Sequence, residues 1–200
     1  MRALLFALCL LPLAALAQPF APETMRISGT VEAADAGSIT VRALEGGGTH
    51  RVFLTPKVAV YAVSTATLAD VKPGAFIGVG ATPNSDGSQR AIRVTVFAES
   101  LRGLGEGFRP WDRAPKGTMT NATVGETVSG VDGRTVTVHY KGGEKRIVIP
   151  PDARILAYAV GDRAELKVGA HVAILRAKRK LDGTWEADRV NVGRGGVIPD

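Results

Sequence analysis

The chain has 200 residues with a formal net charge of +6, and its single cysteine is Cys9. Residues 18–100 carry seven basic and seven acidic residues, whereas residues 101–200 carry seventeen and twelve, so the basic excess lies in the second half. An excess of this size indicates either anionic partners or simply a solubilising surface charge. Beyond Cys9 the chain has no thiol, which excludes disulfides and thiolate metal sites there.

The N-terminus predicts export. Arg2 precedes an apolar run over residues 3–16, and small residues occupy positions 15 and 17, as a signal peptidase requires. The apolar run is shorter than the ~20 residues of a spanning helix, which favours a signal peptide over residues 1–17 rather than a membrane anchor. No second apolar run follows, so we expect no transmembrane segment in the mature chain and a periplasmic or secreted location.

One stretch of the sequence occurs twice. Residues 51–79 and residues 146–174 align at one constant offset, and the match continues with a single inserted residue. The aligned pairs include Arg51 with Arg146, Pro56 with Pro151, Gly74 with Gly169, and, after the insertion, Arg93 with Arg189. A constant offset over this length indicates a duplicated structural unit.

Short strands and turns dominate both repeats. The expected strands of the first repeat are 26–33, 38–44, 50–54, 58–63, 75–81 and 89–98. Those of the second are 127–131, 135–140, 145–149, 154–160, 170–177 and 184–192. Asp35-Ala36-Gly37 and the Asp86-Gly87 pair are turn signals, and Pro56 is expected to end a strand. No long run has the helical period, so the chain is predicted to be all-β, a sandwich or a small barrel.

About five short strands in each repeat, with one helical turn before the fourth main strand and a glycine turn into it, favour an OB-like barrel. We therefore predict two tandem OB-like β-barrels, the first over residues 26–100 and the second over residues 125–193. Residues 101–124 join them as a structured segment that contains glycine, proline and tryptophan.

The repeats resemble a known group of proteins. The segments TLADVKPGAFIGV and RAELKVGAHVAI, each followed by an Asp-Gly hairpin and a strand ending RVTVF or RVNVG, are similar to small OB-like barrels of an exported bacterial family. That family is often tandem and is classed as a domain of unknown function. The resemblance implies a β-barrel fold in the bacterial envelope and carries no activity or site residue.

The segment 101–124 has no counterpart in the other repeat. It contains Phe108 and Trp111, which a flexible linker would lack. One interpretation is that both rings fill a seam between the barrels. The other is that a ligand groove lies there, because domain interfaces often bind ligands. Its residues would be Glu106, Arg109, Trp111 and Asp112.

A basic cluster precedes the Asp182-Gly183 turn of the second repeat. It consists of Arg176, Lys178, Arg179 and Lys180, and the first repeat has no charge at this place. In an OB-like barrel this loop rims the binding face, so the cluster predicts an anion site. The alternative is a charged hairpin that keeps a strand edge from pairing. Nucleic acid is disfavoured, because the second repeat offers few aromatic residues for base stacking.

No catalytic motif occurs in the sequence. There is no G-x-S-x-G, no phosphate-binding glycine loop before a helix, and the carboxylates are mostly turn residues. We therefore expect a non-catalytic binding or scaffolding protein without a cofactor, acting on an anionic envelope component or a protein partner. The alternative is a metal-binding or envelope-stress protein that uses His139 or His171.

Overall fold

The computed structural model describes residues 23–46, 48–130 and 133–199, and within them the chain is all-β. The predicted signal peptide, with Cys9, lies outside the described residues. The strands are β1 (Thr24–Ala34), β2 (Ser38–Ala43), β3 (Thr49–Thr65), β4 (Phe76–Pro83), β5 (Gln89–Phe97), β6 (Gly107–Pro110), β7 (Thr118–Gly130), β8 (Gly133–Tyr140), β9 (Gly143–Ile149), β10 (Arg154–Val160), β11 (His171–Arg179) and β12 (Trp185–Gly193). Three short 3-10 helices join them: η1 (Leu68–Asp70), η2 (Glu99–Leu101) and η3 (Arg163–Glu165). No helix in the described part of the chain is long and apolar enough to cross a bilayer.

Five strands close into a mixed barrel, which confirms the predicted all-β class and the barrel itself. β1 pairs with β2 and β11, β2 pairs with β3, and β11 pairs with β12, all antiparallel. A parallel pairing of β3 with β12 completes the ring. Alternate residues of these strands, among them Val41, Val52 and Ile174, point inward and form one buried core.

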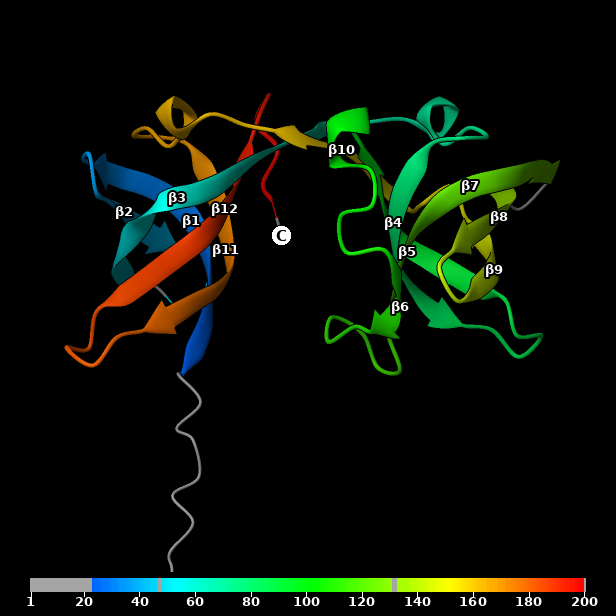
Figure 1. Ribbon diagram of the computed structural model, residues 1–200, viewed down its shortest axis with the longest axis horizontal. Coiled ribbons are helices and arrows are strands. Elements are labelled where there is room, and N and C mark those ends of the chain that lie inside the picture. Colours follow the sequence, from blue (N-terminus) through cyan, green and yellow to red (C-terminus); the bar gives the residue numbers. More distant parts are fainter. Residues whose placement is uncertain (1–22, 47, 131–132, 200) are drawn as a thin grey trace, which may run out of the picture.

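The remaining strands form a second half of the molecule beside the barrel (Figure 1). Their order is β5-β4-β7-β8-β9, and β5 also meets β9 over two residue pairs, while β6 lies against β7. Buried side chains such as Val79, Val94 and Val138 give this half a core of its own. β6 and the start of β7 fall within 101–124, so this predicted joining segment contributes two pairing strands.

The strands of each half come from both repeats. The sequence suggested that strands 75–81 and 89–98 would complete the barrel begun by strands 26–63. In the structure, β4 and β5 instead pair with β7, β9 and β10, whereas β11 and β12 complete the barrel with β1, β2 and β3. The two repeats have thus exchanged their last two strands, and the barrel does not coincide with one repeat of the sequence.

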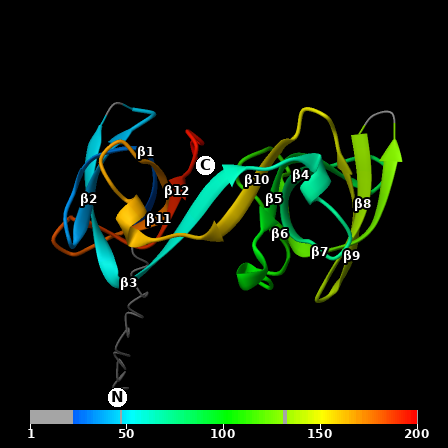
Figure 2. The same ribbon diagram turned by 90° about the horizontal axis from the view of Figure 1, so that it is seen from above.

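The exchange follows from the course of β3. The sequence predicts a stop at Pro56, yet β3 continues to Thr65 and carries the chain out of the barrel (Figures 1 and 2). Pro56 is tolerated because it lies, exposed, where the pairing of β12 passes from Leu54 to Ala59 without using the residues between. The chain therefore reaches the other half before it can turn back.

A short antiparallel ladder between β3 and β10 joins the two halves. It pairs Tyr61 with Val160 and Thr65 with Leu156. Because Arg51 aligns with Arg146, the repeat equivalents of Tyr61 and Thr65 are Leu156 and Val160, so the ladder maps onto itself when the repeats are interchanged. The two repeats are accordingly arranged about an approximate twofold axis through this seam.

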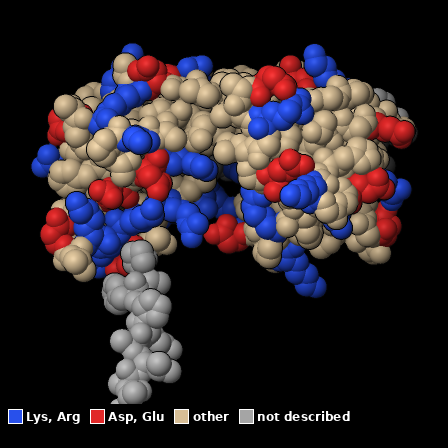
Figure 3. Space-filling view, in the orientation of Figure 1, with Lys and Arg blue, Asp and Glu red and all other residues tan. Residues whose placement is uncertain are grey.

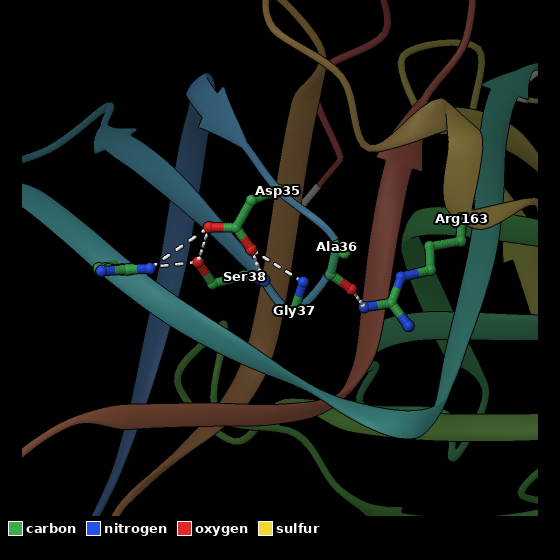
Figure 4. Close-up of polar contacts among 6 residues, drawn as sticks. Asp35, Ala36, Gly37, Ser38 and Arg163 are labelled. Carbon is green, nitrogen blue, oxygen red and sulfur yellow. Dashed lines mark hydrogen bonds and ion pairs between the residues drawn. The ribbon is translucent and has the colours of Figure 1, made fainter.

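Hydrogen bonds fix the crossing connection to the barrel. Arg163 in η3 donates from Nη2 to the carbonyl oxygen of Ala36, 2.5 Å away, in the turn between β1 and β2 (Figure 4). Within that turn, the Asp35 carboxylate accepts from the backbone N–H groups of Gly37 (2.8 Å) and Ser38 (2.6 Å). These bonds, with one from the Ser38 hydroxyl, hold the pKa of Asp35 below its usual value. The turn is thus preorganised to receive the connection from β10.

Cooperative unfolding is expected from the contacts that join the two halves. Trp185 lies on β12 in the barrel and Trp111 packs against β4 in the other half, and the chain has no other tryptophan. Because the β3–β10 ladder and the stacked rings of Tyr61 and Tyr158 connect the halves, we expect Trp111→Phe and Trp185→Phe proteins to unfold at the same urea midpoint by fluorescence. Two separate midpoints would show that these contacts do not couple the halves.

Candidate functional site

A cavity of about 230 Å³ opens between the two halves, next to the seam. Figure 3 shows the hollow, bordered by Lys and Arg side chains. Both halves contribute to its wall, through β5, β10 and β12 and through the turn before β6. Its polar lining comprises Arg93, Thr95, Arg109, Asn121, Tyr158, Arg189 and Asn191. No acidic side chain is among the described residues that line it.

Aromatic rings form one side of the cavity. Tyr158 stacks on Tyr61 with 5.2 Å between ring centroids and meets Phe97 edge-on at 5.6 Å. Phe76 continues the row, 5.3 Å from Phe97. The hydroxyl of Tyr158 donates to Oδ1 of Asn191, and burial raises the pKa of Tyr158 well above its ordinary value. Tyr158 therefore stays neutral and rigid at the centre of the seam.

Three arginines at the cavity and its rim lack a carboxylate partner within ion-pair distance in the described ranges: Arg109, Arg176 and Arg189. Arg109 donates to the carbonyl oxygen of Gly105 at 2.8 Å, and burial lowers the pKa of its guanidinium. Arg189 lies over the ring of Tyr61, 5.1 Å from its centroid. Asp188, its neighbour in sequence, binds Lys178 at 2.8 Å, and Arg189 is a weaker cause of the lowered pKa of Asp188. All three arginines are exposed to solvent, and none has a direct carboxylate contact in the described ranges.

Several residues predicted for a ligand groove lie together at the mouth of this cavity. Arg109, Trp111 and Asp112 line one groove with Arg176 and Arg26, and Arg26 approaches Asp112 at 3.8 Å. A β-bulge in β11, opposite the step from Met25 to Ile27, makes room for Arg176. The sequence placed these residues in two separate candidate sites, and the fold brings them into one.

Trp111 packs against β4 at Gly80 and lines the groove at the cavity mouth. A Cβ atom at Gly80 would come within 2.6 Å of its ring, so only glycine permits this packing. Arg93 covers the ring, 5.5 Å from its centroid. Phe108 does not fill the seam, because 42% of it is exposed and only Lys145 lies over its ring. The seam aromatics are Tyr61, Phe97 and Tyr158, which the sequence analysis did not single out.

The rest of the predicted basic cluster lies outside both cavity and groove. Lys178 pairs with Asp188 at 2.8 Å and Lys180 with Glu186 at 3.8 Å, both across the β11–β12 hairpin. Arg179 pairs at 2.9 Å with Glu23, the residue just before β1. Glu106, predicted for the groove, accepts from the backbone N–H of Lys141 at 2.9 Å. The hairpin pairs thus match the alternative of a charged, protected hairpin better than a free anion site.

The two histidines proposed as metal ligands lie in different surroundings. His139 is 3.4 Å from the carboxylate of Glu144, and His171 is hydrogen-bonded to Thr30 at 3.1 Å. Over the described ranges, no three His, Cys, Asp or Glu side chains come together as metal ligands would. The metal-binding alternative stays a prediction.

No protein family model, curated protein or solved structure matches the chain. The resemblance to an exported tandem-barrel family therefore stays a prediction at the level of the family. The five-stranded barrel supports the β-barrel fold that the resemblance implies, and it does not identify the family.

The sequence did not identify Arg189 as a cavity residue, although the repeat alignment offered one indication of its role. Arg93 and Arg189 are repeat equivalents, and both line the cavity. An arginine at the same position in two diverged repeats indicates that both copies have similar surroundings. In this fold those surroundings are the space about the twofold axis. Without knowledge of the exchange, nothing in the sequence placed these two arginines opposite each other.

Proposed function

We propose that this protein is a non-catalytic binding protein for anionic ligands, which it holds in the cavity between its two halves. The observation that carries the proposal is the convergence of Arg109, Arg176 and Arg189 on one cavity and its mouth without a carboxylate to pair them. We further propose that it acts after export, in the periplasm or outside the cell, on an anionic envelope component.

Charge compensation is the physical basis. Arg109, Arg176 and Arg189 are exposed to solvent as whole residues, and partial desolvation lowers the pKa of the Arg109 guanidinium. A bound carboxylate or phosphate would supply a counter-charge that no described side chain provides by direct contact. It would also accept paired N–H bonds from the planar guanidinium groups, which favour such anions. Asn121 and Asn191, both buried, would add neutral hydrogen-bonding groups beside the charge.

The lining supports binding rather than catalysis. Within the described residues it supplies cations, amides and hydroxyls, but no carboxylate or imidazole that could act as a general base. Tyr158 is held in its neutral form by burial. The alternative ligand is a protein partner that binds in the same cavity. Such a partner would also have to present an acidic group to the arginines.

We also propose that strands β4, β5, β7, β8 and β9 make a second barrel, OB-like as the first. Its support is the course of β5, which runs parallel to β9 at Gln89 and Arg90 and then parallel to β10 from Arg93 to Phe97. β12 follows β3 in the same way in the barrel. The break between β9 and β10, at Pro150 and Pro151, is where β3 remains continuous.

A comparison of two sets of variants tests the proposed function. Binding of inorganic phosphate and of acetate would be followed by chemical-shift titration, and by thermal unfolding, since a ligand in excess raises the midpoint by several degrees. We expect the Arg109→Gln/Arg189→Gln protein to bind about 10-fold or more weakly, because a hydrogen bond to a charged group contributes ~1.5–3 kcal/mol. The matched control replaces Lys178, Arg179 and Lys180 by serine and should keep its affinity.

Either reversal would contradict the proposal. If the serine variant loses binding and the glutamine variant keeps it, the anion site lies on the β11–β12 hairpin. If neither bare anion binds the unchanged protein at millimolar concentration, and no anion with an apolar body binds either, the cavity is not an anion site.

A further inference from the structure

The cavity combines its cations with an apolar wall. The apolar side chains on it come from the seam, from β11 and from the segment around β6: Val63, Phe97, Leu104, Met119, Leu156 and Leu175. Leu104, Met119 and Leu175 are only partly buried, so the cavity exposes apolar surface to water in the unliganded protein. A purely hydrophilic anion would neutralise the arginines and leave the apolar wall of the cavity exposed to water.

We infer that the ligand of this cavity is a small amphiphilic anion, with one carboxylate or phosphate head and a compact apolar body. The inference rests on the proposed function and names the ligand class for the same site. The head would lie at Arg109 and Arg189, and the body would lie against Leu104, Met119 and Leu156. Burial of apolar surface then adds to the charge-assisted hydrogen bonds, at roughly fourfold in affinity for each buried methylene.

The size of the cavity limits the body. A volume of about 230 Å³ lies just below the range usual for ligand pockets, and it equals the space of roughly eight liquid waters at ~30 Å³ each. A ligand of about ten non-hydrogen atoms fits this space, whereas a full-length lipid chain exceeds it. The seam at Tyr158 closes the inner end, since its ring is fixed by Tyr61 and Asn191.

Matched probes separate head from body. Octanoate has both parts, acetate has the head alone, and 1-octanol has the body without the charge, while octyl phosphate distinguishes a phosphate from a carboxylate head. Dissociation constants from chemical-shift titration of the full mature chain should show octanoate binding at least about 10-fold more tightly than acetate. Octanol should bind at least about 10-fold more weakly than octanoate.

Variants that fill the cavity test where the body lies. Leu104→Trp should reduce the affinity for octanoate to about that for acetate. Leu104 lies in the turn before β6, where a larger side chain is better tolerated than in a strand. If this protein does not fold, Met119→Trp fills the cavity from the neighbouring strand β7 and gives the same readout.

The outcomes distinguish the inference from the proposed function. Equal affinities for octanoate and acetate, both reduced in the Arg109→Gln/Arg189→Gln protein, would overturn the amphiphile and leave the anion site intact. Octanoate binding that survives either tryptophan substitution would overturn the placement of the body. If no probe binds with any dependence on Arg109 and Arg189, the proposed function fails with the inference.

Discussion

Replacing Gly29 by alanine is expected to lower the free energy of unfolding by about 3 kcal/mol or more. Gly29 pairs with Ala43 between β1 and β2 of the barrel. A Cβ atom there would lie 1.9 Å from the carbonyl oxygen of Arg42 and 2.8 Å from a methyl group of Val41. The obstructing atoms belong mainly to the backbone, so they can move only if the β1–β2 pairing opens.

Gly125→Ala is the matched control for Gly29→Ala. A Cβ atom at Gly125 would also be too close to a neighbour, 2.4 Å from Nε2 of His139. That neighbour is the end of a side chain that is 55% exposed and can rotate away, so we expect a loss below about 1 kcal/mol. Urea unfolding of both proteins measures the difference. Equal losses would show that the β1–β2 contact is less rigid than the structure indicates.

The second large effect is expected at the seam. Tyr158→Ala should destabilise the protein by about 3 kcal/mol, at the low end of the loss for truncating a large aromatic, because the ring is partly buried. The ring contacts Tyr61 and Phe97, one from each half of the molecule. Its loss should therefore lower the unfolding midpoint equally whether Trp111 or Trp185 reports the transition.

Tyr158→Phe separates the ring from its hydroxyl. The phenylalanine keeps the contacts with Tyr61 and Phe97 and loses only the hydrogen bond to Asn191, so we expect a loss of about 1 kcal/mol. A loss as large as that of Tyr158→Ala would assign the stability to the hydrogen bond rather than to the rings. A shift seen by only one tryptophan would show that the two halves unfold independently.

The sequence predicted the strands far better than their partners. Alternation and turn residues depend on neighbours in the chain, and they located β2, β8 and the hairpins correctly. The strand with which each hairpin pairs depends instead on which of the two cores its apolar face fills. The β4–β5 and β11–β12 hairpins present similar faces, such as Val79 and Ile174 at equivalent positions, so either hairpin suits either core and the pattern alone cannot decide.

The candidate site was predicted in part for the same reason. Arg109, Trp111 and Asp112 lie within a few residues of one another, so a local argument placed them in a groove. Lys180 was predicted to belong to an anion site, whereas in the structure it pairs with Glu186. That partner lies across a hairpin whose register the sequence did not determine. Arg189 was missed because its place at the cavity depends on the exchange.

The exchange of strands also sets an order for folding during synthesis. Residues 76–160 contain the strands of one half without interruption, so that half can form while the rest of the chain is still being made. The barrel must wait, because β1, β2 and β3 emerge first and the strands that seal them, β11 and β12, emerge last. Until then the open edges of β1 and β3 are exposed to other chains.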